Sequence, residues 1–110
     1  MPIVNIYYSD ELLANRAVDL SPKIKLFFAK ILSCNDIDLN SNEITIRIIE
    51  TRNQTIAPLE VEIFAHYFSE RVDNQDKICL DLREFLLEQI PEANDIRVWL
   101  ILSELGHSWD

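Results

Sequence analysis

Glycine is almost absent from this chain of 110 residues, which contains only Gly106. Loops that cradle phosphate groups need several residues without a Cβ atom, so the sequence has neither a P-loop nor a dinucleotide-binding turn. Histidine and cysteine are also scarce, with two of each. Cys34 and Cys79 form no CxxC motif and lie in helix-like contexts, so we predict that both are core thiols. We expect no metal site and no cofactor.

Positive charge is in short supply. The 10 Lys and Arg residues are outnumbered by 19 Asp and Glu residues, which gives a formal net charge of −9. No basic face is available to neutralise phosphates, so nucleic acid is not expected as a partner. The chain lacks the long uncharged run of a transmembrane helix and the N-terminal pattern of a secretory signal. We therefore predict a cytoplasmic protein that does not bind membranes.

Alternating apolar segments are abundant. Four segments have the β-branched and aromatic composition that is typical of strands: residues 3–8, 44–49, 59–68 and 95–103. Helix-start signals lie between them. A short helical piece can follow Asp10, a longer helix can start at Ser21 and Pro22, and another can start at Ser69 and end at Pro91.

The order of these elements is strand, helix, strand, twice over. It predicts a single domain over residues 1–110, built from two βαβ repeats at about 2–50 and 58–103. The fold class is α/β, in the form of an α+β two-layer sandwich. Two helices then cover one face of a four-stranded sheet.

The other face of the predicted sheet combines charges of both signs with Phe64, Trp99 and Ile101. An exposed sheet face seldom carries so much apolar surface, so we predict that another subunit covers it. Arg47 and Arg97 could then pair across strands with Glu60 and Glu62. The alternative is a partly solvated, salt-bridged face on a monomer.

Two superfolds share this order of elements: the ferredoxin-like fold and the tautomerase fold. Four motifs bear on the choice: PIVNIYY at residue 2, TIRIIET at residue 45, PLEVEIFAHYF at residue 58 and NQDKICLDLREFL at residue 74. The first two resemble strands of 4-oxalocrotonate tautomerase (4-OT), in the tautomerase and macrophage migration inhibitory factor superfamily. The last two resemble an uncharacterised bacterial branch of it. The two-repeat length resembles macrophage migration inhibitory factor and 5-carboxymethyl-2-hydroxymuconate isomerase.

This resemblance implies a tautomerase that uses its N-terminal proline as general base. Once Met1 is removed, Pro2 presents a secondary amine that burial can keep uncharged at neutral pH. Such an amine can move a proton on a small keto or enol acid. In the match to 4-OT, Arg47 takes the position of the substrate-binding arginine and would hold a carboxylate. The family also implies a homo-oligomer, most simply a homotrimer.

Four further residues are candidates for substrate contacts. Tyr8 and Trp109, together with Tyr7, could form the wall of an apolar pocket near Pro2, although packing is the commoner role of such aromatics. Glu50 could hold a substrate hydroxyl or be a solvated acid at the end of a strand. Arg71 lies near an arginine of the bacterial branch, or simply balances acids at a helix start.

Two other functions stay open. Arg47 could be part of a structural ion pair instead of the site, which would leave a catalytically silent oligomer that binds a small ligand or a protein. A ferredoxin-like module that binds a small ligand is the third possibility.

Overall fold

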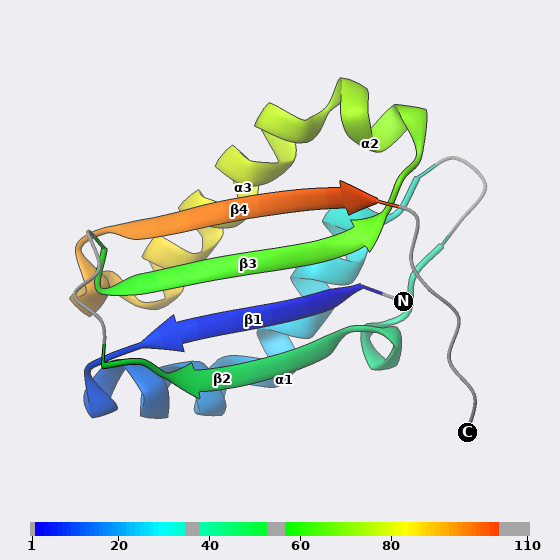
Figure 1. Ribbon diagram of the computed structural model, residues 1–110. Coiled ribbons are helices and arrows are strands. Elements are labelled where there is room, and N and C mark those ends of the chain that lie inside the picture. Colours follow the sequence, from blue (N-terminus) through cyan, green and yellow to red (C-terminus); the bar gives the residue numbers. More distant parts are fainter. Residues whose placement is uncertain (1, 35–37, 53–56, 104–110) are drawn as a thin grey trace.

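The computed structural model describes residues 2–34, 38–52 and 57–103. Helices cover one face of a four-stranded sheet and leave the other face open (Figure 1). The strands are β1 (Ile3–Tyr8), β2 (Thr45–Glu50), β3 (Leu59–His66) and β4 (Ile96–Ser103). The helices are α1 (Glu11–Leu32), α2 (Ser69–Asp73) and α3 (Gln75–Gln89), with short 3-10 turns η1 (Ser41–Glu43) and η2 (Pro91–Ala93). The predicted two-layer α+β fold is confirmed.

The connectivity of the sheet separates the two superfolds. The strand order is β2-β1-β3-β4; β1 is parallel to β2, β3 is parallel to β4, and the central pair β1 and β3 is antiparallel. In the split βαβ unit of a ferredoxin-like fold, another strand lies between the two strands of each unit. Here the two strands of each βαβ unit are hydrogen-bonded neighbours. The ferredoxin-like alternative is therefore excluded.

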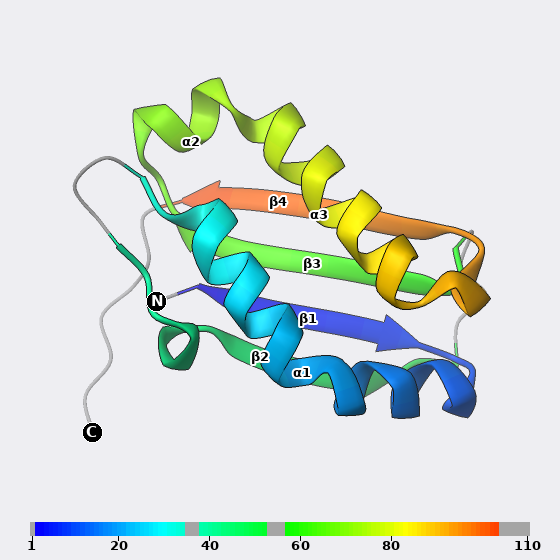
Figure 2. The same ribbon diagram turned by 180° about the vertical axis from the view of Figure 1, so that it is seen from behind.

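Helix α1 is continuous where the sequence predicted two pieces. Pro22 lies inside it instead of at the start of a second helix. Proline has no N–H to donate and its ring crowds the preceding turn, so a bend is expected there. The Ser21 hydroxyl donates to the Ala17 carbonyl oxygen at 3.0 Å in this region. Figure 2 shows the first half of α1 running in a different direction from its second half.

The second predicted helix is divided. Phe68 is the N-cap residue of α2, one residue before the predicted start, and Asn74 separates α2 from α3. After η2, Asn94 has a φ angle of 64°, in a region that favours glycine, but the only glycine in the sequence is Gly106. No helix in the described ranges combines the length and the apolarity required to cross a membrane.

The core lies between the sheet and the helices (Figure 2). The register aligns Val4 of β1 with Ile46 of β2 and Ile63 of β3, so the apolar faces of the strands coincide. The central strands and the helices contribute side chains that are at most 1% exposed: Val4, Ile6, Val61, Ile63, Ile24, Phe28, Leu32 and Leu82. The predicted division of each strand into a helix-facing and an open side follows this register.

Candidate active site

Pro2 is buried and directly precedes β1. Its carbonyl oxygen accepts a hydrogen bond from the Thr45 N–H at 3.1 Å, which fixes the backbone at the start of the sheet. Strands β1 and β2 begin at this end of the molecule, β3 and β4 end there, and α1 also ends there (Figure 2). The second residue of the chain is therefore held in a rigid environment.

The end of β3 borders Pro2. Ile3 is the partner of Phe64 in the antiparallel pair, and continuing this register by one residue puts Ala65 opposite Pro2. The following residue, His66, is half-buried, and the Tyr67 N–H donates to the Ser103 carbonyl oxygen of β4 at 3.1 Å. This strand end therefore forms one side of the Pro2 region.

Arg71 joins the end of β3 to the end of α1. Arg71 is only 3% exposed. Nε and Nη2 donate to the Leu32 carbonyl oxygen at 3.1 and 2.8 Å, and Nη1 donates to the His66 carbonyl oxygen at 2.9 Å. The guanidinium also lies over the ring of Phe68, 4.9 Å from its centroid. Burial lowers the pKa of Arg71 because the charged form loses its hydration, with a smaller opposing effect from Cys34.

Arg47 lies on the open face of the sheet. It is exposed, and its partner in β1 is Asn5. By strand alternation Pro2 shares the helix-facing side with Val4, whereas Arg47 shares the other side with Asn5. Within one protomer the structure therefore does not bring Arg47 and Pro2 together.

Tyr8 and Glu50 are neighbours of each other but lie at the far end of the sheet from Pro2. Tyr8 packs partly against the core. Loss of hydration raises the pKa of its hydroxyl, and the negative charges of Glu11 and Glu50 add to this. Trp109, the last predicted contact, lies outside the described residues.

Glu62 organises a polar cluster on the open face that the sequence did not reveal. One of its carboxylate oxygens accepts hydrogen bonds from Asn5 Nδ2 at 3.2 Å and from the Tyr7 hydroxyl at 2.8 Å. The hydrogen bond to Glu62 is the main cause of a raised pKa of Tyr7. The only signal in the sequence was a polar residue, Asn5, inside an apolar strand.

The predicted ion pairs of Arg47 and Arg97 with Glu60 and Glu62 are not formed within the described part of the chain. Glu62 instead accepts hydrogen bonds from Asn5 and Tyr7 on one of its oxygens. Arg97 instead lies near the ring of Trp99, with its guanidinium carbon 5.9 Å from the ring centroid.

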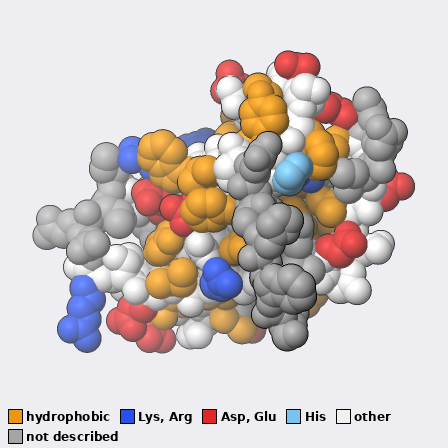
Figure 3. Space-filling model, turned by 45° about the vertical axis from the view of Figure 1, so that its right-hand side comes forward, with side chains coloured by type: hydrophobic (Ala, Val, Ile, Leu, Met, Phe, Trp, Pro, Cys, Tyr) orange, Lys and Arg blue, Asp and Glu red, His pale blue; other side chains and the backbone are white. Residues whose placement is uncertain are grey.

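The open face carries exposed apolar side chains. Trp99 is 50% exposed and Ile101 is 37% exposed, both on β4. Several hydrophobic side chains are visible among acidic and basic groups in Figure 3. These exposed side chains include two of the three residues, Trp99 and Ile101, on which the prediction of a covering subunit was based.

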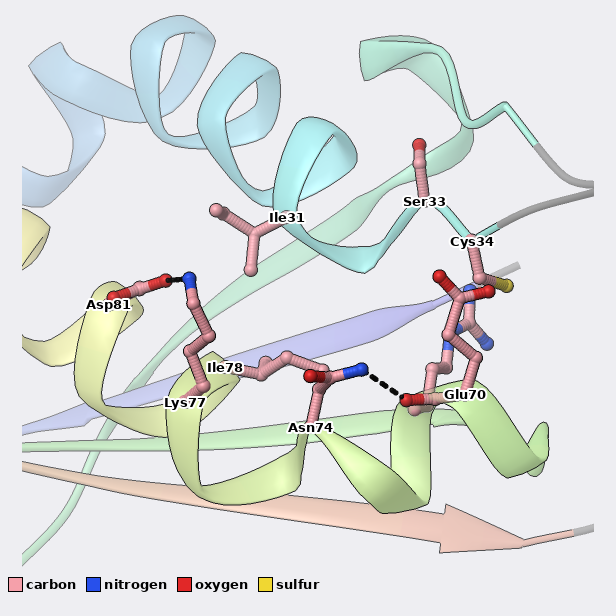
Figure 4. Close-up of a pocket in the computed structure, with 9 residues that line it drawn as sticks. Ile31, Ser33, Cys34, Glu70, Asn74, Lys77, Ile78 and Asp81 are labelled. Atoms are coloured by element: carbon pink, nitrogen blue, oxygen red, sulfur yellow. Dashed lines mark hydrogen bonds and ion pairs between the residues drawn. The ribbon is translucent and has the colours of Figure 1, made fainter.

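A hollow of about 210 Å³ lies between the end of α1 and the α2–α3 segment (Figure 4). Its lining combines apolar, polar and charged residues: Ile31, Ser33, Cys34, Glu70, Arg71, Asn74, Lys77, Ile78 and Asp81. The Lys77 ammonium donates to Asp81 at 2.8 Å, and Arg71 donates to main-chain oxygens. Neither cation in this hollow is therefore uncommitted.

The two cysteines and the possible metal ligands were examined for reactive groupings within the described ranges. Cys34 and Cys79 are free thiols, and each is partly exposed where full burial was predicted. Cys34 is at the edge of the hollow, and partial burial raises the pKa of Cys79. Among the residues that the structure describes, no three His, Cys, Asp or Glu side chains form a group that could hold a metal ion.

No family model and no curated protein matches the sequence. The fold, however, is similar to solved structures. A protein of unknown function from Vibrio cholerae has a TM-score of 0.69 at 14% identity, over 98% of this chain and 82% of its own. A fused wild-type 4-OT asymmetric trimer has a TM-score of 0.65 at 17% identity, over 96% of this chain and 91% of its own. A 5-carboxymethyl-2-hydroxymuconate isomerase from Deinococcus radiodurans R1 has a TM-score of 0.55 at 15% identity, over 99% of this chain and 87% of its own. The chain therefore has the tautomerase fold, as its motifs predicted.

Proposed function

We propose that this protein is a cofactor-independent tautomerase that moves a proton on a small keto or enol acid, with Pro2 as general base. The observation that carries this proposal is the burial of Pro2 at the start of β1, in a fold shared with 4-OT and with a hydroxymuconate isomerase. Removal of Met1 would turn the Pro2 nitrogen into a secondary amine. Burial would penalise the cation and favour the free base.

The reaction proceeds by two proton transfers. The neutral Pro2 amine takes a proton from a carbon next to a carbonyl, and the electron pair of the C–H bond moves into the conjugated system. The protonated amine then returns the proton to another atom of the same system. Negative charge develops on the carbonyl oxygen between these steps, so a nearby cation would lower the barrier.

Assembly of several copies is part of the proposal, with a homotrimer as its simplest form. The apolar area around Trp99 and Ile101 supports a covering subunit, as does the description of a fused 4-OT as a trimer. Arg47 is exposed on the same face of the sheet as Trp99. A site between subunits is the arrangement in which Arg47 of one copy could serve Pro2 of another and hold the substrate carboxylate.

Two measurements test the function. The intact mass of protein purified from its own host should be that of the chain without Met1. Turnover of phenylenolpyruvate or 2-hydroxymuconate should then fall by about 10²- to 10⁴-fold in Pro2→Ala, the range for loss of a positioned acid or base. Retention of Met1 in the cell, or equal rates for the two proteins, would exclude Pro2 as the base.

One observation favours a second function. Within a protomer, Tyr8 and Glu50 lie far from Pro2, and Arg71 is committed to main-chain oxygens. A catalytically silent oligomer of the same fold, which binds a ligand or a partner protein, needs none of these groups near Pro2. Native mass spectrometry would detect the oligomer for both functions, and only the enzyme would lose turnover in Pro2→Ala.

A further inference from the structure

We propose that Glu62 and Arg97 form an ion pair between neighbouring copies of this chain, in which the Glu62 carboxylate of one copy accepts hydrogen bonds from the Arg97 guanidinium of the next. This inference rests on the assembly of several copies that is part of the proposed function, and it adds the contact that determines how the copies meet. It does not depend on proton transfer by Pro2.

The first argument is that the polar cluster around Glu62 has hydrogen-bond acceptors left over. Asn5 and Tyr7 both donate to Oε1 of Glu62, so Oε2 has no hydrogen bond to a residue in the described ranges. Asn5 is only 8% exposed, and its Oδ1 atom is buried without a donor from the described residues. Unpaired acceptors of this kind are costly when buried. The cluster is therefore incomplete within one protomer and suits a group with several N–H donors, such as a guanidinium.

The second argument is that Arg97 belongs to the apolar area of the open face. Arg97 and Trp99 are successive residues on this side of β4, and the guanidinium carbon lies 5.9 Å from the centroid of the Trp99 ring. Trp99 is 50% exposed. A subunit that covers Trp99 therefore also takes Arg97 out of water. Burial of a guanidinium is costly unless it is paired, so the covering surface has to present an acceptor to it.

The third argument is that the two groups do not satisfy each other inside one protomer. The register of β3 and β4 places Glu60 beside Arg97 and Glu62 beside Trp99. Neither carboxylate forms an ion pair with Arg97 within residues 2–34, 38–52 and 57–103. The Glu62 carboxylate is instead held by Asn5 and the Tyr7 hydroxyl, so its free oxygen is already oriented for a second partner.

The charges of the open face identify a second copy of this chain as the partner. The chain as a whole has a net charge of −9, which opposes contact between copies. On the open side of the four strands, however, the acidic and basic side chains are equal in number: Glu60, Glu62, Arg47 and Arg97. A face that presents both signs is complementary to itself. Each copy can thus give Arg97 to one neighbour and accept a guanidinium on Glu62 from another.

The test is a charge exchange, with size-exclusion chromatography and light scattering over a dilution series as the measurement. Glu62→Arg and Arg97→Glu should each raise the concentration at which the assembly dissociates by about 10²-fold or more, because each places two like charges in contact. The double variant Glu62→Arg/Arg97→Glu restores opposite charges and should recover most of the association. Circular dichroism checks that all three variants are folded.

Two controls separate the contact from the change in net charge. Glu84→Arg changes the net charge by the same amount as Glu62→Arg, and Lys23→Glu by the same amount as Arg97→Glu. Both residues are exposed, and they belong to α3 and α1, which cover the other face of the sheet (Figure 1). The control variants should dissociate at the same concentration as the wild type.

Mixing the two single variants shows whether the pair is formed between copies. Contacts between identical variants repel, whereas a contact between Glu62→Arg and Arg97→Glu copies joins opposite charges in both directions. Each variant alone should therefore be monomeric at a concentration where their mixture forms mixed oligomers in native mass spectrometry. A pair formed within one protomer would give no gain on mixing, and that result would overturn the proposal.

The remaining outcomes are distinguishable from failure of the proposed function. A monomeric wild type would overturn both the ion pair and the proposed assembly. An assembled wild type whose mass is unchanged in Glu62→Arg and Arg97→Glu would overturn the ion pair alone. Rescue of Glu62→Arg by Arg47→Glu but not by Arg97→Glu would overturn the assignment of Arg97. Turnover that depends on Pro2 tests the general base separately from all of these.

Discussion

At the residue scale, Arg71 donates three hydrogen bonds to two main-chain oxygens, those of Leu32 and His66. We expect Arg71→Met to lower the free energy of unfolding by about 2–5 kcal/mol, because methionine fills much of the same volume but leaves the oxygens of Leu32 and His66 without donors. Urea unfolding followed by circular dichroism measures this loss.

Arg52→Met is the matched control for that experiment. Arg52 is exposed, so its replacement should change the free energy of unfolding by no more than about 0.5 kcal/mol. Equal effects of the two substitutions would show that the buried contacts of Arg71 do not contribute to stability beyond those of an ordinary surface arginine.

Tyr7 gives the molecule an alkaline pH dependence. The Glu62 carboxylate accepts the hydrogen bond of its hydroxyl and so raises the pKa of Tyr7 in the folded state. A group with a raised pKa stabilises the fold below its unfolded pKa and loses this contribution as the pH rises through the folded value. The stability contributed by Tyr7 should therefore be complete at neutral pH and decline above about pH 10.

Tyr7→Phe and Tyr67→Phe test this dependence with thermal unfolding at pH 8 to 11. Tyr67 is 53% exposed, so Tyr67→Phe should follow the wild type, whereas Tyr7→Phe should be less stable at pH 8 and should converge on the wild type at the alkaline end. Parallel curves for the wild type and Tyr7→Phe over the whole range would contradict the prediction.

At the element scale, α1 and α3 are joined by an aromatic contact. The rings of Phe27 and Phe85 are stacked, with 4.0 Å between centroids and 4° between planes. We expect Phe27→Leu to cost about 1–2 kcal/mol, and a double-mutant cycle with Phe85→Leu to give a coupling of about 0.5–1.5 kcal/mol. Denaturant unfolding of the four proteins gives both values.

Leu26 provides the reference for this cycle. It is adjacent to Phe27 but 66% exposed, so Leu26→Ala should couple to Phe85→Leu by less than about 0.5 kcal/mol. A coupling as large as that of Phe27 would mean that the cycle reports on helix propensity instead of ring stacking.

Most elements could be predicted from the sequence because a two-residue alternation is specific for half-buried strands. The segment 59–68 was predicted to be a strand, but the strand ends at His66 because Phe68 already caps α2. The signals of Ser21 and Pro22 were read as a helix start. Such signals are local, and α1 continues through them because its apolar side chains pack on the sheet in both halves.

The candidate site was harder to predict because it depends on which end of a strand a residue occupies. Pro2 and Tyr8 are six positions apart in an extended chain, which separates them by about 20 Å. Arg71 lies one position from an arginine of the bacterial branch, yet its role depends on main-chain oxygens of Leu32 and His66 that only the tertiary fold brings near. Sequence patterns contain no direct signal for such contacts.

At the scale of the whole molecule, the open sheet face should govern association. We expect Trp99→Lys to shift the protein from the proposed trimer to monomer, because burial of an ammonium in an apolar contact is costly. Size-exclusion chromatography with light scattering measures the mass directly. The net charge of −9 on every copy opposes association, so the apolar contact has to outweigh that repulsion.

Leu80→Lys is the comparison for this substitution. Leu80 is 52% exposed, much like Trp99, but it belongs to α3 on the other side of the sheet. It should leave the mass unchanged. Dissociation by Leu80→Lys but not by Trp99→Lys would assign the interface to the helical layer.

The tight seating of the second residue affects how the protein can be produced for study. Pro2 is buried and its carbonyl oxygen accepts a hydrogen bond from Thr45, so residues added ahead of it would alter the surroundings of the proposed base. An affinity tag fused ahead of Pro2 would convert its nitrogen to an amide and abolish the basicity on which the proposed chemistry depends. Assays with such a fusion would report an inert protein whatever its natural activity, so purification handles belong at the opposite terminus.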